Sequence, residues 1–497
     1  MLTIRQSMAA LTIALGAIAC GSNASGTTGP DSGGGGTVTL SGTGVITWVT
    51  DTGNQTTNAD YSTSAFAALD PNNGFAAIAG IGNANGTFSI PNVPASGTLY
   101  VKYGRNYFVV DGRPTFDLGY ELMGRPDYAS AITSPTNLTF SISNMASWQS
   151  GDGIGLFSIG GGAAWNWIDQ TGATNPPGVG ATTLNMTGDM TQAPDPYLPS
   201  ASKGDVSWLL QYTIGTSSGG TQYGQLTRYV RDTTINMTDG KPTTMSGTFT
   251  AVSPNKTTPS FNLLRSAWAS FASTVNPTAS VSSNFLGVMA NYAPSGAAGI
   301  DLAPQLASMF KNSATTDVNL GTLAYANPFP SSWAEMFQVH TSYHVSYMAP
   351  GATTALDLYP SVGQQVLLSG APTTVSPTLG PAQSIKIGGQ SASTQLSGVG
   401  LTPTISWSAP AVGTPQAYSV WVYHLTNSSG TTQWSTAAVF YTKATSVTVP
   451  PNVLTSGNTY YVAISALTSG TVDLTYSPYR SRLPYAWANA LTATFTP

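Results

Sequence analysis

Few residue groups in this chain have the types and spacing that could do chemistry, and the closest match to a catalytic motif centres on a serine. Residues 215–219 read Gly-Thr-Ser-Ser-Gly, which fits the G-x-S-x-G pattern around Ser217. That motif works where a strand enters a helix through a sharp turn that exposes the serine hydroxyl. Here a second strand-like run follows, as far as Val230. We therefore predict a hairpin loop and no serine nucleophile.

Two of the three histidines, His340 and His344, lie in a run in which apolar and polar residues alternate, residues 337–347. On a strand, their spacing places the two Cα atoms about 13 Å apart. Two ligands of one zinc ion, each bonded at about 2.1 Å, do not reach across that distance. We predict that both histidines face solvent and that the chain holds no metal.

Hydrolysis of glycosides needs two close carboxylates. The only glutamates, Glu121 and Glu335, fall in different regions of the sequence, and the aspartates are scattered. We therefore expect no catalytic residues and no cofactor. A secreted hydrolase with its site in the central region stays open as a second alternative.

One pair of aromatic residues could bind sugars. Trp165 and Trp167 project to the same face of a predicted strand, and Asp169 follows on that face. Exposed tryptophan rings stack on sugar rings, whereas buried rings fill the core of a β-sandwich. We favour the core for these rings and keep the three residues as a possible ligand surface.

A dense ionic patch is the other candidate site. It places six charged residues within residues 111–127, in a chain of which only 7% is charged. Its arginines, Arg113 and Arg125, could bind the carboxylates or phosphates of a ligand. We favour the alternative, a local salt-bridge network that fixes a loop. The six residues are Asp111, Arg113, Asp117, Glu121, Arg125 and Asp127.

The start of the chain predicts export. Residues 1–19 combine Arg5 with an apolar run of about 12 residues, the pattern of a signal peptide and too short to span a bilayer. Cys20, the only cysteine, follows directly. Residues 17–20, Ala-Ile-Ala-Cys, resemble the lipobox of bacterial lipoproteins, which implies a diacylglyceryl group on the Cys20 sulfur. A secreted protein that begins at an unmodified Cys20 is the alternative.

The next segment has the composition of a flexible tether. Residues 20–37 are rich in Gly, Ser and Thr and carry one charge, Asp31, so they bury nothing. Gly21 also lacks the aspartate that, by resemblance to Gram-negative lipoproteins, retains them at the inner membrane. We therefore expect the outer membrane or the cell surface, with an extracellular protein as the alternative.

The composition of the 497 residues bounds the folded part. A hydrophobic share of 41% suffices for buried cores, and abundant Gly, Thr and Tyr favour strands and turns. A net charge of −4 without a basic run excludes a nucleic-acid partner. We predict an all-β protein of tandem β-sandwich domains with one helix in the central region.

The first predicted domain spans residues 38–143. Asn85-Gly86 predicts a tight turn, and Phe88 and Ile90 alternate as one buried face of the strand that follows. The turn, this strand and the return strand resemble the carboxypeptidase regulatory-like (transthyretin-like) sandwich. That resemblance implies a fold and no activity.

The central region, residues 144–370, matches no family that we recognise. It contains strand-like runs and one predicted helix over residues 263–275, in which Trp268 and Val275 recur at helical spacing. We expect a β-rich domain on which this helix packs.

Residues 371–497 resemble a fibronectin type III domain. The resemblance implies that Trp407 fills the core and that Leu454 and Tyr460 form the tyrosine corner, with the Tyr460 hydroxyl bonded to the preceding backbone. We expect this region to fold alone.

These features lead us to expect an exported, lipid-anchored cell-surface protein with a binding, structural or adhesive role. Its partners would be the membrane, through the N-terminal lipid, and a polysaccharide or another surface protein. A carbohydrate-binding surface protein is the first alternative.

Overall fold

The structure is a computed structural model that describes residues 36–50, 52–127, 132–170, 172–193, 197–293 and 303–497. Its described residues form strands in several sheets, with helical structure limited to short segments. The predicted all-β class is therefore confirmed, including the place of the helix in the central region. The predicted signal peptide, Cys20 and nearly all of the tether lie outside the described residues.

The strands up to residue 143 form two small sheets and contribute to two others. They are β1 (Thr37–Thr43), β2 (Val45–Thr50), β3 (Gly53–Asn58), β4 (Phe66–Asp70), β5 (Ala76–Ala79), β6 (Ile81–Gly82), β7 (Thr87–Pro94), β8 (Leu99–Tyr103), β9 (Asn106–Val110), β10 (Thr115–Asp117), β11 (Tyr120–Met123) and β12 (Asn137–Ser143).

Two of these sheets pack as a sandwich. The sheet β10-β1-β7-β6 lies against β4, β5, β8 and β9, and the rings of Phe66 and Phe88 stack between them at 4.2 Å. The predicted turn at Asn85-Gly86 is present, because Gly86 takes a φ of 81°, which glycine adopts without strain. Ile90 is fully buried, as the alternation predicted.

The strands between residues 144 and 370 form the central region. They are β13 (Gly153–Ser158), β14 (Ala163–Trp165), β15 (Ala173–Thr174), β16 (Leu184–Asp189), β17 (Ser207–Thr216), β18 (Gln222–Asp232), β19 (Thr243–Thr248), β20 (Thr250–Ala251), β21 (Lys256–Thr257), β22 (Phe261–Leu263), β23 (Ser280–Asn291), β24 (Gln305–Asn312), β25 (Val318–Gly321), β26 (Ala324–Tyr325), β27 (Ala334–Tyr347), β28 (Leu356–Leu358) and β29 (Ser361–Leu367).

The predicted helix over 263–275 forms two short helices instead of one. They are α2 (Arg265–Ala269) and α3 (Ala272–Val275). Trp268 and Val275 are buried, as their spacing predicted. Asn276 ends the second helix because its backbone is extended, with φ −164° and ψ 144°.

The last strands complete the fold. They are β30 (Thr374–Val375), β31 (Gln383–Ile387), β32 (Gln390–Ser391), β33 (Thr404–Ser408), β34 (Ala417–Ser428), β35 (Thr431–Thr442), β36 (Ser446–Thr448), β37 (Thr459–Ser469) and β38 (Tyr485–Leu491).

The C-terminal region has the core that its resemblance implied. Trp407 is 6% exposed and meets Tyr418 edge to face at 5.1 Å, and Leu454 is buried. The Tyr460 hydroxyl accepts a hydrogen bond from the backbone N–H of Thr455 at 3.0 Å, so the expected bond to the preceding backbone is present.

Replacing Tyr460 with Phe should therefore lower the free energy of unfolding by about 1–2 kcal/mol, because the Thr455 N–H loses its acceptor. Urea unfolding of the two proteins measures the difference. Tyr485→Phe, a change of the same atoms on a half-buried ring, serves as the comparison. An unchanged midpoint for Tyr460→Phe would contradict the role given to this hydroxyl.

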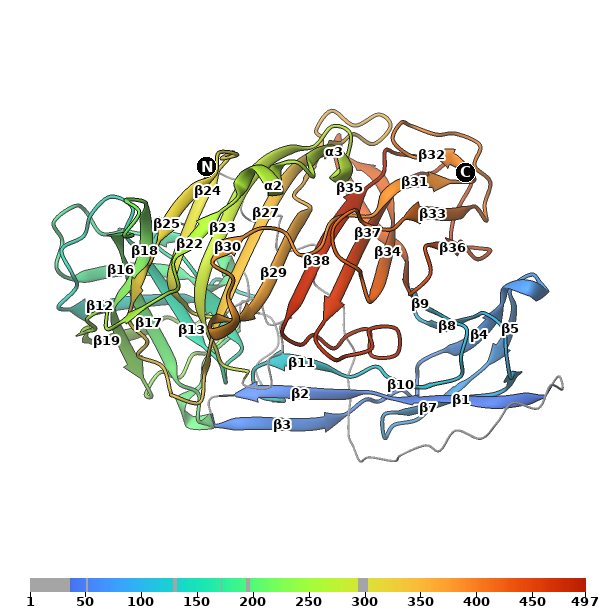
Figure 1. Ribbon diagram of the computed structural model, residues 1–497. Coiled ribbons are helices and arrows are strands. Elements are labelled where there is room, and N and C mark those ends of the chain that lie inside the picture. The colour runs from blue at the N-terminus through green and yellow to red at the C-terminus, as the bar shows by residue number, and fades with distance from the viewer. Residues whose placement is uncertain (1–35, 51, 128–131, 171, 194–196, 294–302) are drawn as a thin grey trace.

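One continuous sheet of 18 strands runs through all three regions (Figure 1). The central strand β29 pairs with β38 of the C-terminal region, with Val362 opposite Ala488. In turn, β35 pairs in parallel with β9 of the first region, with Val439 opposite Asn106. Two short strands also cross the predicted boundaries: β12 joins β16 and β19, and β30 joins β22.

These ladders join the predicted domains through shared backbone hydrogen bonds. Whether residues 371–497 fold alone stays a prediction, but the isolated region would uncover one edge at β38 and another at β35. Unpaired strand edges are templates for association with other chains.

Candidate functional site

The G-x-S-x-G segment forms a tight hairpin loop, as predicted. It connects β17 to β18, and the Ser217 Oγ accepts a hydrogen bond from the Thr221 N–H at 3.0 Å. Ser217 is 5% exposed, and no helix follows it. The hydroxyl thus closes a turn instead of standing free as a nucleophile.

His344 is half-buried at the C-terminal part of β27. Its Nε2 lies 2.8 Å from Oδ1 of Asp357 on the neighbouring strand β28. The imidazole also meets the ring of Tyr359, with the centroids 5.5 Å apart. This pair fastens β28 to β27.

The prediction that both histidines face solvent holds only in part for His340, whose side chain is half-buried. Its half-buried ring stacks on Phe285 with the centroids 5.2 Å apart and lies 6.3 Å from the ring of Trp487. Burial among these groups lowers the pKa of His340 to about 4. The sequence of β27 shows polar residues on this face, whereas the aromatic neighbours come from β23 and β38.

The possible ligand surface is buried at Trp165 and half-buried at Trp167. Trp165 is 1% exposed in the core of the central sandwich, so it has no face to offer a sugar. Trp167 is half-buried, with its ring over the backbone of Gly153 and 5.4 Å from Tyr212. Trp165 is therefore a core residue and not an exposed ring that could stack on a sugar.

Asp169 belongs to the same buried turn. Its Oδ1 accepts a hydrogen bond from the Ile154 N–H at 2.7 Å, which holds the turn after β14 against β13. Burial raises the pKa of Asp169 to about 6, and the nearby carboxylate of Asp152 adds to the increase. Sequence reasoning missed this pair of carboxylates because 17 positions of hairpin separate them, from residue 152 to residue 169.

Arg113 fixes loops of the first region through their carbonyl groups. Its guanidinium donates to the carbonyl oxygens of Pro94 at 2.6 Å, Ser96 at 3.0 Å and Gly97 at 2.9 Å. It also reaches the carbonyls of Asp111 and Gly112. The predicted role in fixing a loop is thus correct for Arg113, with backbone acceptors in place of carboxylates.

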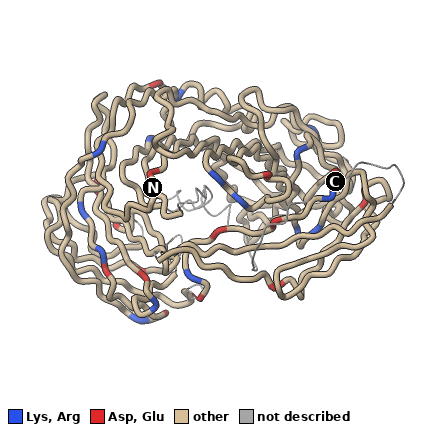
Figure 2. Tube along the Cα trace, turned by 60° about the horizontal axis from the view of Figure 1, so that its bottom comes forward, with Lys and Arg blue, Asp and Glu red and all other residues tan. Residues whose placement is uncertain are grey.

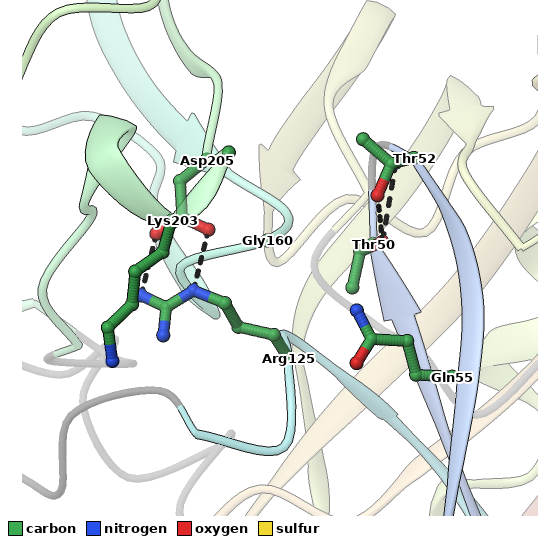
Figure 3. Close-up of a pocket in the computed structure, with 8 residues that line it drawn as sticks. Thr50, Thr52, Gln55, Arg125, Gly160, Lys203 and Asp205 are labelled. Atoms are coloured by element: carbon green, nitrogen blue, oxygen red, sulfur yellow. Dashed lines mark hydrogen bonds and ion pairs between the residues drawn. The ribbon is translucent and has the colours of Figure 1, made fainter.

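Arg125 makes a long-range contact. Its guanidinium binds Asp205 in two-pronged geometry, Nε to Oδ1 at 2.9 Å and Nη2 to Oδ2 at 2.8 Å, across 80 residues of sequence (Figure 3). Both side chains are buried, at 6% and 1% exposure. Hydrogen bonds to Asp205 raise the pKa of Arg125 above its usual value. The expectation of a local network is therefore wrong here.

The remaining charges extend this network. Asp127 bridges Arg125 at 3.0 Å and Lys203 at 2.7 Å, and these two partners lower the pKa of Asp127 to about 2. Asp117 binds Arg480 at 2.9 Å, and Glu121 binds Arg482 at 2.6 Å. The patch thus ties the first region to both other regions.

A small recess lies beside Arg125. It is lined by Thr50, Thr52 and Gln55 on one side and by Arg125, Lys203 and Asp205 on the other (Figure 3). Its volume of about 20 Å³ is room for a single water molecule. Because Asp205 already neutralises Arg125, the recess offers no substrate site.

Within the part of the chain that the structure describes, no group of three or more His, Cys, Asp or Glu side chains is placed to hold a metal ion. The described helices also include none with the length and apolar character that crossing a bilayer requires.

Comparisons with known proteins assign this chain to no family. No protein-family model matches it, and no curated protein matches it significantly. Among solved structures, the FN1–FN3 domains of chicken CNTN1 share 12% identity over 75% of this chain and 99% of that one, with a TM-score of 0.12.

Two further solved structures are similar in the same way. Escherichia coli alpha-2-macroglobulin activated by porcine elastase shares 10% identity over 93% of this chain and 42% of that one, with a TM-score of 0.15. A tetra-tandem repeat in the extending region of a large adhesion protein shares 13% identity over 91% of this chain and 99% of that one, with a TM-score of 0.12. These neighbours include fibronectin-type and adhesion-protein chains.

Proposed function

We propose that the chain is an exported, lipid-anchored cell-surface protein whose role is binding or adhesion and not catalysis. Export and anchoring rest on the sequence of residues 1–20. The observation that carries the non-catalytic role is that three described side chains of types used in catalysis and ligand binding hold the fold together. Ser217 closes a hairpin, His344 fastens β28, and Arg125 joins two regions through Asp205.

The architecture supports the same role. A sheet that continues through every region, tied further by ion pairs from Asp117 and Glu121, holds its exposed faces in a fixed arrangement. Binding by a preorganised surface loses little conformational entropy. The buried Trp407 and the Tyr460–Thr455 bond support a fibronectin type III-like C-terminal region within this scaffold.

The anchoring is tested at Cys20. The wild-type protein is expected to partition with membranes and to incorporate labelled fatty acid, and Cys20→Ser should lose both, because the lipid is attached to the sulfur. Ser22→Ala, in the same segment, is the matched control and should behave as the wild type. Recovery of the wild type in the soluble secreted fraction, with an unmodified Cys20 at its N-terminus, would contradict lipid anchoring.

The absence of catalysis is tested with a screen of ester, peptide and glycoside substrates. We expect no turnover by the purified protein. Turnover that Ser217→Ala abolishes would overturn the proposed role and favour the hydrolase alternative.

A further inference from the structure

A row of aromatic residues crosses five neighbouring strands of the continuous sheet. In the strand register Phe310 of β24 lies opposite Phe285 of β23, which lies opposite His340 of β27. The row continues through Gly363 of β29 to Trp487 of β38. At about 4.8 Å between strands, it spans about 19 Å.

This side of the sheet differs from the opposite side, which is covered. On the covered side, the Tyr343 hydroxyl donates to the Trp268 carbonyl of α2 at 2.6 Å, and the ring of Phe337 packs on Phe261 of β22. In the row itself, Phe310 is 52% exposed, and Phe285, His340 and Trp487 are half-buried. We call the side that carries these four residues the aromatic face.

Two of the rings lie flat on the sheet instead of standing upright. A Cβ on residue 363 would collide with Cζ2 of Trp487, and a Cβ on residue 287 would lie 2.7 Å from Cζ of Phe285. Each ring therefore covers a glycine, and the Trp487 ring has its other face turned away from the sheet. Phe285 and His340 are stacked on each other, with centroids 5.2 Å and planes 21° apart, so together they form one stacked pair.

On these five strands the aromatic face carries no Lys, Arg, Asp or Glu, and the carboxylate of Asp357 on β28 is paired with His344. Of the residues in β23, β24, β27, β29 and β38, only Lys311 and Glu335 are charged. Both lie at odd positions on strands whose aromatic face is formed by even positions. Figure 2 shows how sparse the charged residues are along the whole trace. His340 is neutral near pH 7, since burial lowers its pKa to about 4.

An uncharged hydroxyl lies beside the rings. Ser361 is half-buried on the same face, and its Oγ accepts a hydrogen bond from the Trp487 indole N–H at 2.8 Å. This bond fixes the plane of the Trp487 ring. A hydroxyl of this kind also binds the hydroxyl groups of an uncharged ligand.

We propose that the aromatic face binds a neutral polysaccharide, whose sugar rings stack on Trp487, on the stacked Phe285–His340 pair and on Phe310. Flat aromatic rings offer an apolar surface that suits the C–H faces of sugars. An elongated row suits a chain more than a single sugar, and a face without cations gives a polyanion nothing to pair with. The inference rests on the proposed binding role and names the class of ligand for it.

The test measures retention of the full-length, detergent-solubilised protein on insoluble cellulose, chitin and starch, and its binding to soluble xylan. We expect the wild type to bind at least one of these probes, and to bind the anionic polygalacturonate more weakly. Trp487→Ala should weaken binding about tenfold, the loss of one stacked ring. Phe310→Ser should also weaken it, and because this side chain is exposed, its loss leaves the fold intact.

Trp434→Ala is the matched control, since Trp434 is half-buried on β35 and packs on Tyr423, outside the row. It should bind as the wild type. Binding that is lost in both row variants and kept in the control supports the inference. A wild type that binds none of the neutral probes, or row variants that bind as tightly as the wild type, would overturn it. A lipidated, membrane-bound protein without such binding would leave the proposed function standing.

Discussion

Replacing Arg125 with Met is expected to lower the free energy of unfolding by about 3–5 kcal/mol, because the carboxylate of Asp205 stays buried without its partner. The side chains of this pair are 6% and 1% exposed, so bulk water does not solvate the carboxylate in place of the guanidinium. Among the described residues, Asp205 still accepts the hydrogen bond from the Ser200 N–H at 2.7 Å. Denaturant unfolding followed by tryptophan fluorescence measures the effect.

Two further variants test whether the loss of stability in Arg125→Met comes from burying an unpaired charge. The double variant Arg125→Met, Asp205→Leu should recover much of the loss, since no unpaired charge is left inside. Lys443→Met breaks the exposed pair of Lys443 and Asp473, whose side chains are 53% and 42% exposed, and should cost less than about 1 kcal/mol. Equal effects of Arg125→Met and Lys443→Met would refute the account given for Arg125.

Replacing Asp169 with Asn is expected to stabilise the protein by about 2–3 kcal/mol at pH 8. The pKa of Asp169 is raised from 3.8 to about 6, so the folded state binds the proton more tightly than the unfolded state. The contribution of this carboxyl to stability is therefore full below pH 3.8 and is lost as the pH rises through 6. Asparagine stays neutral at every pH and still accepts from the Ile154 N–H.

The measurement is the difference in unfolding free energy between Asp169→Asn and the wild type at steps from pH 4 to pH 8. The advantage of the variant should be small at pH 4 and grow until about pH 7. The lowered pKa of His340 makes its contribution to stability rise with pH over a similar range. This contribution cancels in the difference because both proteins contain His340. Asp60→Asn should show no gain, because hydrogen bonds from Ser62 lower the pKa of Asp60. A difference that is flat with pH would contradict the assignment to Asp169.

The sequence predictions that proved correct rest on patterns among residues close together in the chain. Alternation identified Ile90 as buried, and glycine and serine composition identified the hairpin at Ser217. The resemblance to a fibronectin type III domain implied the bond of Tyr460 near Leu454. Each of these depends on neighbours within about ten residues, where turn chemistry and strand period decide the structure.

The predictions that failed depended on partners far along the chain. Arg125 pairs with a carboxylate 80 residues away, and nothing near either residue identifies the other. The burial of His340 comes from rings on β23 and β38, and the sequence of β27 contains no signal of either. Trp487 and Phe285 were likewise missed, although Gly287, two positions after Phe285 on its strand, is a signal that could have been used.

The parallel ladder between β9 and β35 has a consequence for the making of the protein. Val439 pairs with Asn106, so 333 further residues (439 − 106) must be synthesised after Asn106 before its partner exists. At 5–20 residues per second, this takes about 17 to 67 s. During that interval the edge of β9, whose sequence Asn-Tyr-Phe-Val-Val has neither charge nor proline, stays uncovered. A cell that makes this protein must keep that nascent edge from self-association, and a holding chaperone during export would meet that need.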